Sequence, residues 1–335
     1  MKRITAFILA LTSLILPAHA GGENSAPEPN DFVEEIMEAN FIKDGSYAIG
    51  FRSLYDGETW LCNANEYFKV ASVYKMPLNM YFYEQEAAGE IAPDELVAGM
   101  ALDTCHWYSL EYSNNEISEA MVDYLGGYAQ FKRDILKYIG DAADDVTDEY
   151  YYDNAFTAEM VLNILDYLYT NADVFRQQLE HMLAAQPGEY LKSGELGCDI
   201  AQKYGYQVYD GVLHIAVAGI VYADEPFLLT VLTRRSYGAV EAMGELCDAF
   251  AAWEKGRVGL LREEEAERQE AERLEAERLA ELERHDSAAK SETLKALCAA
   301  ASASPLPGFV PWRLLFSELE GSVADALPDM IRDSK

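Results

Sequence analysis

The chain has 335 residues and a formal net charge of −32 at pH 7. A surface this acidic repels phosphate backbones, which argues against nucleic acid as a partner. After the first 20 residues no stretch approaches 18 uninterrupted apolar residues, so no membrane span is expected.

Residues 1–20 have the features of a secretory signal peptide. Lys2 and Arg3 precede an apolar run from Ile4 to Leu16, and the segment ends in Ala-His-Ala, a small-x-small cleavage pattern. The run is short for a bilayer span, and no cysteine follows closely enough for a lipid anchor. We expect an exported protein, periplasmic or extracellular, that is soluble after cleavage near Gly21.

The next elements alternate between polar connections and short regular segments. Residues 21–30 are polar and contain proline, which predicts a linker, and Asn30 or Asp31 can cap a helix that runs through Met37. Residues 45–54 and 58–64 are similar to strands, and Asp56-Gly57 between them is a hairpin signal.

The middle of the domain is helical and its end returns to strands. Residues 74–183 carry apolar side chains at helical spacing. Strand-like segments follow at residues 188–194, 199–211, 214–223 and 226–235, before a helix at residues 239–254. This order predicts an α+β domain over residues 31–255, with one antiparallel sheet built from both ends of the domain and a mostly helical lobe.

From Gly256 the composition changes to a Glu- and Arg-rich repeat. Its charges fall at i,i+3 and i,i+4, which predicts a solvent-exposed helix over residues 256–285. The repeat is five residues long, so it builds no heptad seam. A C-terminal tail of unknown role covers residues 286–335, and an envelope partner could bind through residues 256–335.

The five cysteines are widely spaced and include no CxxC pair, so no zinc site is expected. Export permits disulfides, but the odd count leaves at least one thiol and the spacing reveals no pairing. We interpret them mainly as buried small apolar side chains; they are Cys62, Cys105, Cys198, Cys247 and Cys298.

A Ser-x-x-Lys motif occurs twice, at Ser72–Lys75 and at Ser287–Lys290. The spacing places an amine beside a hydroxyl on one helical turn, where the amine can remove the hydroxyl proton. Ser72 starts an apolar helix after the predicted hairpin, whereas the surroundings of Ser287 are fully polar. Ser72 is therefore the candidate nucleophile.

The segment NEYFKVASVYKMPL around Ser72 resembles the nucleophile segment of class A β-lactamases and related penicillin-binding proteins. The resemblance implies a Ser-x-Asn motif in the helical lobe, which Ser113-Asn114-Asn115 supplies. It further implies that Ser72 and Lys75 act with Ser113, and that Asn115 holds the substrate amide. The implied fold is the β-lactamase/transpeptidase fold.

The family also has a Lys-Thr-Gly or Lys-Ser-Gly motif on a strand beside the nucleophile. Lys192-Ser193-Gly194 matches the letters, but the spacing to the following strand favours Lys203-Tyr204-Gly205. Tyr204 then replaces the hydroxyl residue that helps to hold the substrate carboxylate. The backbone N–H of Tyr206 would form the oxyanion hole together with that of Ser72.

The last family feature is a loop with the glutamate that directs the deacylating water. Glu149 is the candidate, yet it lies only a few residues before the next helix, so the loop is expected to be shortened and the resemblance does not imply rapid deacylation. The adjacent residues Tyr150 to Tyr152 are interpreted as packing aromatics. We expect His106 to border the cleft and His214 to be structural.

The resemblance implies a serine hydrolase that forms an acyl-enzyme on Ser72 with a β-lactam or a D-Ala-D-Ala-type peptidoglycan stem peptide, with no metal or organic cofactor. The alternatives are a D,D-peptidase or slow penicillin-binding protein, or a non-catalytic cell-envelope binding module that retains the fold. The altered Lys203-Tyr204-Gly205 motif favours the last of these. The retained side chains of Ser72, Lys75 and Ser113 favour catalysis.

Overall fold

The computed structural model describes residues 28–97 and 99–302. The predicted signal peptide, almost all of the linker and the tail from residue 303 lie outside these residues. No helix in the described part is long and apolar enough to cross a membrane. A compact unit ends at Leu261, a few residues later than the predicted boundary, because Val258 is still fully buried.

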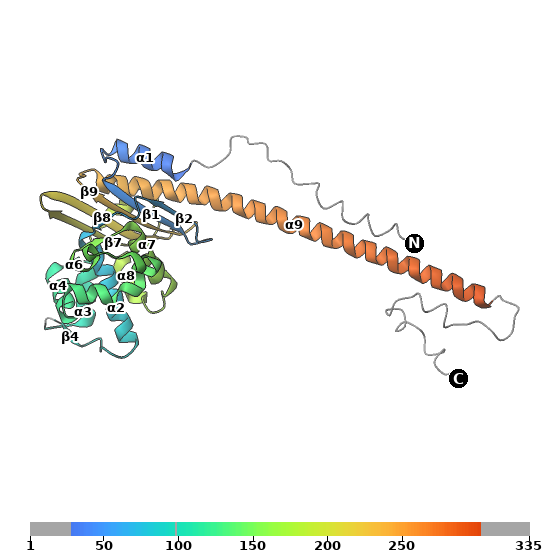
Figure 1. Cartoon of the computed structure of the whole chain (residues 1–335), viewed down its shortest axis with the longest axis horizontal. Helices are drawn as coiled ribbons and strands as arrows, with labels where there is room; N and C mark the ends of the chain where they lie inside the picture. The colour runs from blue at the N-terminus through green and yellow to red at the C-terminus, as the bar shows by residue number, and fades with distance from the viewer. Residues whose placement is uncertain (1–27, 98, 303–335) are drawn as a thin grey trace. The chain divides into compact units, whose positions relative to one another are not determined.

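One five-stranded antiparallel sheet organises the compact unit (Figure 1). The strand order is β2-β1-β9-β8-β7, so the first two strands of the chain pair with its last three. This confirms the predicted sheet from both ends of the domain. Its strands are β1 (Tyr47–Ser53), β2 (Thr59–Cys62), β7 (Ile200–Tyr209), β8 (Val212–Val221) and β9 (Phe227–Arg234).

The predicted helical lobe is also confirmed. Its helices are α2 (Lys75–Ala87), α3 (Leu102–Leu110), α4 (Asn115–Tyr124), α5 (Tyr128–Asp134), α6 (Asp148–Tyr152), α7 (Ala158–Thr170) and α8 (Arg176–Leu183), with the 3-10 segments η1 (Ala71–Tyr74) and η2 (Leu136–Asp145). Two short strand pairs complete it, β3 (Phe68–Lys69) with β6 (Ala155–Phe156) and β4 (Leu96–Val97) with β5 (Met100–Ala101).

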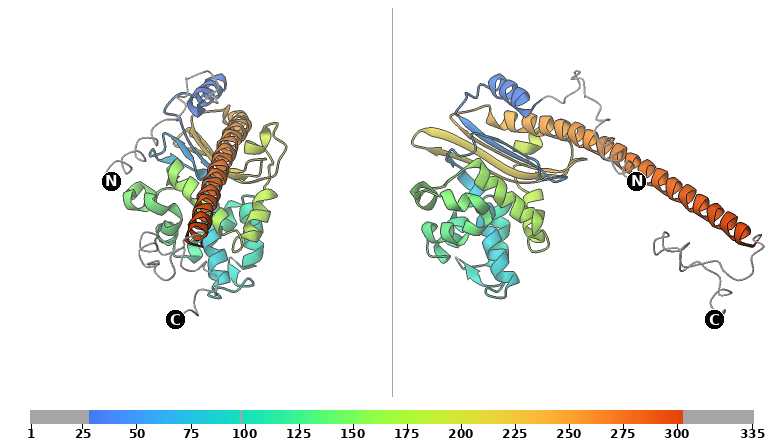
Figure 2. Two further views of the ribbon diagram at one scale, coloured as in Figure 1. Left: turned by 90° about the vertical axis from the view of Figure 1, so that its right-hand side faces the viewer. Right: turned by 45° about the vertical axis from the view of Figure 1, so that its right-hand side comes forward.

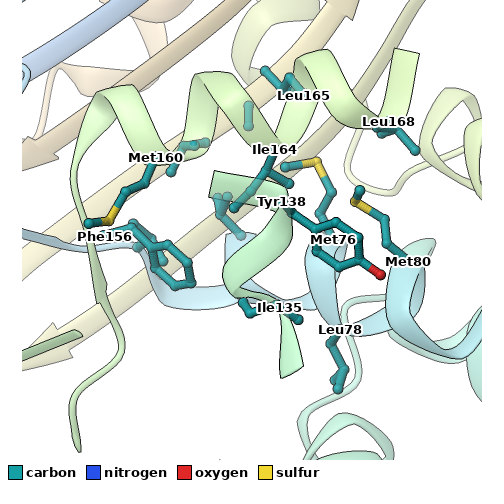
Figure 3. Close-up of a cluster of buried hydrophobic side chains, with 14 of the residues drawn as sticks. Met76, Leu78, Met80, Ile135, Tyr138, Phe156, Met160, Ile164, Leu165 and Leu168 are labelled. Carbon is teal, nitrogen blue, oxygen red and sulfur yellow. The ribbon is translucent and has the colours of Figure 1, made fainter. Parts of the chain in front are cut away.

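The two faces of the sheet bury separate cores. The helical lobe covers one face, while α1 (Pro29–Ala39) and the beginning of α9 (Ala239–Ser302) cover the other (Figures 1 and 2). Along β1, Ala48 joins the lobe core, whereas Ile49 and Phe51 join the core under α9. Figure 3 shows part of the lobe core, where methionines of α2 meet apolar side chains of α7.

Three local predictions are corrected. Helix α1 begins at Pro29 with Glu28 as its N-cap, not at Asn30 or Asp31, because proline has no N–H to lose in the first turn and its φ already suits a helix. Residues 188–194 form no strand; their centre is the 3-10 segment η3 (Tyr190–Ser193). Gly256 does not start a separate helix, since α9 runs unbroken through it to Ser302.

From Arg262 onward α9 carries the Glu- and Arg-rich repeat, and it continues past residue 285 through residues 286–302, which were predicted to belong to the tail. Arg273 pairs with Glu270 and Glu277, one turn away on either side. Ser287 and Lys290, the second Ser-x-x-Lys copy, lie here in exposed positions, and Lys290 pairs with Asp286 at 2.7 Å. The setting of this copy is polar, as predicted.

Candidate active site

Ser72 lies in η1, the 3-10 turn that leads directly into α2. The N–H of Lys75 donates to the Ser72 carbonyl, so the two residues of the Ser-x-x-Lys motif are one helical turn apart. Pro77 occupies the first turn of α2, where a missing N–H costs no intrahelical hydrogen bond. The Ser72 side chain is half-buried and therefore reachable from solvent.

Lys75 is a buried amine with three oxygen partners. Its side chain is 0% exposed, and its Nζ donates to the Ser113 carbonyl at 2.6 Å and to Asn115 Oδ1 at 2.7 Å. The Ser113 Oγ is 3.4 Å away. Lys75 thus connects the start of α2 to the Ser-x-Asn motif.

The backbone of the Ser-x-Asn motif is shaped to make these contacts. Ser113 has φ +53°, a left-handed conformation that is uncommon for a residue with a β-carbon. Asn114 is the N-cap of α4, because its side chain accepts from the N–H of Ile117 at 2.9 Å. The cap fixes the helix start, and Asn115 follows as its first residue.

Lys203, and not Lys192, reaches this cluster. Lys203 is on β7, is 0% exposed, and its Nζ donates to Ser113 Oγ at 3.0 Å. Lys192 is in η3, where its Nζ donates to the Leu183 carbonyl at 2.6 Å. The Ser113 hydroxyl therefore lies between two buried amines, Lys75 and Lys203.

Burial sets the charge of both amines. It lowers the pKa of Lys75 to about 7, against a smaller opposing effect of the Glu119 carboxylate. Burial also brings the pKa of Lys203 well below its usual range, and the nearby Lys75 lowers it further. At neutral pH a substantial fraction of Lys75 is an uncharged amine that can accept a proton.

Gly205 allows β7 to approach the nucleophile. A β-carbon on Gly205 would lie 2.4 Å from the Ser72 nitrogen and 2.7 Å from the Val70 carbonyl oxygen, closer than real contacts permit. Only glycine therefore lets this strand run beside the backbone of Ser72. Tyr206, the next residue, is 63% exposed and lines the same pocket as Ser72.

The pocket at Ser72 has a volume of about 410 Å³. Residues of the helical lobe and of strand β7 form it, with aromatic, amide and acidic groups around the serine. The lining residues are Ala71, Ser72, Tyr74, Asn115, Glu119, Val122, Asp123, Tyr128, Asn154, Tyr206 and Gln207. Its size suits a small molecule or the end of a peptide.

Comparisons with known proteins find one matching family model and several similar folds. A model of a β-lactamase enzyme family matches residues 30–104, the part that contains Ser72 and Lys75. A β-lactamase from Chitinophaga pinensis is 17% identical with a TM-score of 0.58, over 68% of this chain and 99% of that chain. A β-lactamase from Burkholderia vietnamiensis is 16% identical with a TM-score of 0.56, over 69% and 98%. No curated protein matches.

An ancestral class A β-lactamase, that of the last common ancestor of Gram-negative bacteria, superposes equally well. It is 16% identical with a TM-score of 0.58, over 68% of this chain and 99% of that chain. The chain has the class A β-lactamase fold. The resemblance predicted from the motifs is thereby confirmed.

Within this β-lactamase fold, the predicted deacylation loop does not bring Glu149 to the pocket. Glu149 is exposed on α6 and is not among the residues that line the pocket. Its neighbour Tyr150 is buried instead, and its hydroxyl donates to the Lys132 carbonyl at 2.9 Å. Tyr152 is 75% exposed, so the prediction that all three tyrosines pack is wrong for this one.

Asn154, which the sequence analysis missed, is the residue of this loop that reaches the nucleophile. Its Nδ2 donates to the Ala71 carbonyl at 2.8 Å, and its Oδ1 accepts from the Tyr128 hydroxyl at 2.9 Å. The pairing of β6 with β3 holds it there, since β3 ends just before Ser72 in the chain. The sequence signal was an amide residue at the end of the expected loop.

Two acidic residues of the pocket were also missed. Glu119 and Asp123 follow Asn115 at intervals of four on α4, so all three share one helix face. That spacing was visible in the sequence. Both carboxylates are exposed.

The remaining predicted positions lie away from the pocket. The ring of Tyr204 is 7% exposed and stacks on Tyr190 with a centroid distance of 4.4 Å, on the sheet face that α9 covers. His106 was predicted to border the cleft, but its side chain is 0% exposed and it does not line the pocket. His214 is buried in β8, and burial lowers its pKa.

The described residues hold no group of three His, Cys, Asp or Glu side chains that could bind a metal ion. Among the cysteines, Cys105 and Cys247 are buried, Cys62 and Cys198 are half-buried, and Cys298 is exposed. The interpretation as buried apolar side chains therefore holds for two of them.

Proposed function

We propose that this protein is an exported serine hydrolase that forms an acyl-enzyme on Ser72 with a β-lactam or a D-Ala-D-Ala-type amide. The observation that carries the proposal is the position of the Ser113 hydroxyl, 3.4 Å from the buried amine of Lys75 and 3.0 Å from that of Lys203. A scaffold has no need for two buried amines around a hydroxyl beside a serine pocket, because burying them is costly.

We propose the following steps for acylation. Neutral Lys75 accepts the Ser72 hydroxyl proton as Oγ attacks the substrate carbonyl. The N–H groups of Ser72 and Tyr206 stabilise the oxyanion that develops. As the carbonyl–nitrogen bond breaks, the Ser113 hydroxyl donates its proton to the leaving nitrogen, and Lys75 or Lys203 replaces that proton. Asn115 holds the substrate amide. Gly205 lets β7 run beside the backbone of Ser72.

Deacylation requires a water molecule and a base to take its proton. We propose that it is slow, because Glu149 is exposed and outside the residues that line the pocket. We assign Lys75, again neutral, as the base for this step, because its Nζ contacts Ser113 and Asn115, and Asn115 lines the pocket. A slow penicillin-binding protein or D,D-peptidase is the second candidate function, favoured by the exposed position of Glu149.

The test is intact-mass analysis of the mature protein during incubation with a penicillin, with Ser72→Ala as the control. We expect the wild type to gain one penicillin mass and Ser72→Ala to gain none. A long-lived adduct indicates a penicillin-binding protein, and rapid release of hydrolysed drug indicates a lactamase. If no adduct and no hydrolysed drug form, the proposal is wrong.

A further inference from the structure

A series of buried polar side chains connects the helix that carries Lys75 to the loop that carries Ser113. Its four members are 0% exposed and lie on three helices: Asn79 on α2, His106 and Ser109 on α3, and Ser118 on α4. None of them lines the pocket. Buried polar groups in native proteins are almost always paired, so the hydrogen bonds among them can be followed one by one.

Asn79 is the branch point. Its Nδ2 donates to the Lys75 carbonyl at 2.6 Å and to Ser109 Oγ at 2.9 Å, which uses both of its N–H groups. Its Oδ1 lies 2.6 Å from His106 Nδ1 and must accept from it. The opposite amide orientation would place two acceptors, Oδ1 and the Lys75 carbonyl, against each other. His106 therefore carries a proton on Nδ1.

The two serines continue to the Ser-x-Asn loop. Ser118 Oγ is 2.6 Å from the Asn114 carbonyl oxygen and 2.9 Å from Ser109 Oγ. A hydroxyl has one proton and a carbonyl can only accept, so Ser118 donates to Asn114. Ser109 accepts from Asn79 and must donate to Ser118. The directions of all the bonds follow, from His106 to the backbone between Ser113 and Asn115.

The ring of His106 is itself held tightly. It stacks on Tyr83 with a centroid distance of 3.8 Å and an interplanar angle of 11°. Burial lowers its pKa, against the opposing effect of Glu86, whose Oε2 is 3.7 Å from Nε2. The ring is thus held in place as the donor to Asn79, at the end of the series opposite the Asn114 carbonyl.

We propose that His106, Asn79, Ser109 and Ser118, called the His106 chain below, are positioning residues that set the distance between Lys75 and the Ser113–Asn115 loop. The proposal rests on the proposed function, which makes that distance matter for proton transfer. One end of the His106 chain holds the Lys75 carbonyl, and the other holds the Asn114 carbonyl. The Nζ of Lys75 donates to the two residues on either side of Asn114.

The test cuts the His106 chain with Ser118→Ala, at a residue that does not line the pocket, and restores the hydroxyl with Ser118→Thr. The matched control is Gln178→Met, because Gln178 is also 0% exposed and donates to an α2 carbonyl, that of Met76, at 3.1 Å, but does not join the chain. We expect the acylation rate constant with a fluorescent penicillin to fall roughly tenfold or more in Ser118→Ala, since misplacement of reacting groups is costly. Ser118→Thr and Gln178→Met should stay within about threefold of the wild type on the same reasoning.

A second readout needs no substrate. The Lys75 side-chain resonance is titrated by NMR in the same variants, and we expect its midpoint to move in Ser118→Ala, to return in Ser118→Thr and to stay in Gln178→Met. If the wild type is not acylated, the proposed function fails and this titration alone decides the inference. Should Ser118→Ala not fold, His106→Phe keeps the ring on Tyr83 and cuts the other end. An unchanged midpoint, or equal effects of Ser118→Ala and Gln178→Met, would overturn the inference.

Discussion

Two regions around Ser72 differ in how the fold holds their functional groups. The lysine region, Lys75, Ser113 and Lys203, draws on a helix, a loop and a strand, and both amines are fully buried. The loop region, residues 147–154, reaches the pocket through Asn154, while its carboxylate Glu149 faces solvent. Under the proposed function, hydrogen bonds hold the groups that form the ester, whereas the carboxylate expected to help break it is exposed.

Under the proposed function, the groups for the two half-reactions are therefore held by different parts of the fold. Acylation needs an uncharged amine near a hydroxyl, and the buried amines of Lys75 and Lys203 lie 3.4 and 3.0 Å from the Ser113 hydroxyl. Deacylation by a loop carboxylate depends on the length of one irregular segment. Substitutions that change one region at a time test this difference.

The largest effect is expected from Lys75→Met. It removes the amine that accepts the Ser72 proton while it keeps an unbranched apolar stem in the buried site. We expect the acylation rate to fall by about 10²- to 10⁴-fold, the usual contribution of a general base. Stopped-flow measurement with a fluorescent penicillin checks this. A variant that still acylates at the wild-type rate would remove Lys75 from the mechanism.

Lys203→Met should have the next largest effect. Its amine is 3.0 Å from Ser113 Oγ, so its loss weakens proton transfer to the leaving nitrogen by roughly 10²-fold, as for loss of one catalytic hydrogen-bond donor. The matched control is Lys192→Met, a lysine that donates to the Leu183 carbonyl outside the site. Loss of acylation only in Lys192→Met would contradict the assignment of the strand motif.

Gly205→Ala tests the approach of β7 to the nucleophile. The added methyl group would lie 2.4 Å from the Ser72 nitrogen, so strand or serine must shift. We expect acylation to slow by roughly tenfold or more, because a small displacement of the oxyanion donors is costly. Gly188→Ala is the control, since a β-carbon there meets nothing within 4 Å. Equal acylation rates in the two variants would show that the oxyanion hole does not depend on this contact.

The pH dependence of acylation should follow the charge of Lys75. Its pKa is lowered to about 7 by burial, and only the neutral amine accepts the serine proton. The rate should therefore reach a plateau above pH 7 and fall below it, by about tenfold per pH unit for a single base. A pH profile of single-turnover acylation measures this. A rate that does not fall between pH 7 and pH 5 would assign the proton to another base.

The sequence predicted the sheet, the lobe and the lysine region, because periodic apolar patterns and short motifs are local features. The preference for Lys203 over Lys192 came from its spacing to the next strand. Of these two lysines, Lys203 is the one whose amine donates to Ser113 Oγ in the structure. His106 was misplaced because a histidine near a motif does not reveal which way its helix faces. Asn154 was missed because the pairing of β6 with β3, which no motif reveals, brings it to Ala71.

The smallest effects should come from the carboxylates. Glu149→Gln is expected to leave deacylation within about twofold, since an exposed surface change rarely alters function. Glu119→Gln should move the acidic limb of acylation to lower pH, because the Glu119 charge raises the pKa of Lys75 and its removal lets that pKa fall further. Asp123→Asn, one turn further along the same face of α4, is the control and should shift the limb less. Adduct lifetimes and pH profiles measure both effects. A tenfold longer adduct in Glu149→Gln would show that the loop closes on the acyl-enzyme, and the contrast between the two regions would then apply only before acylation.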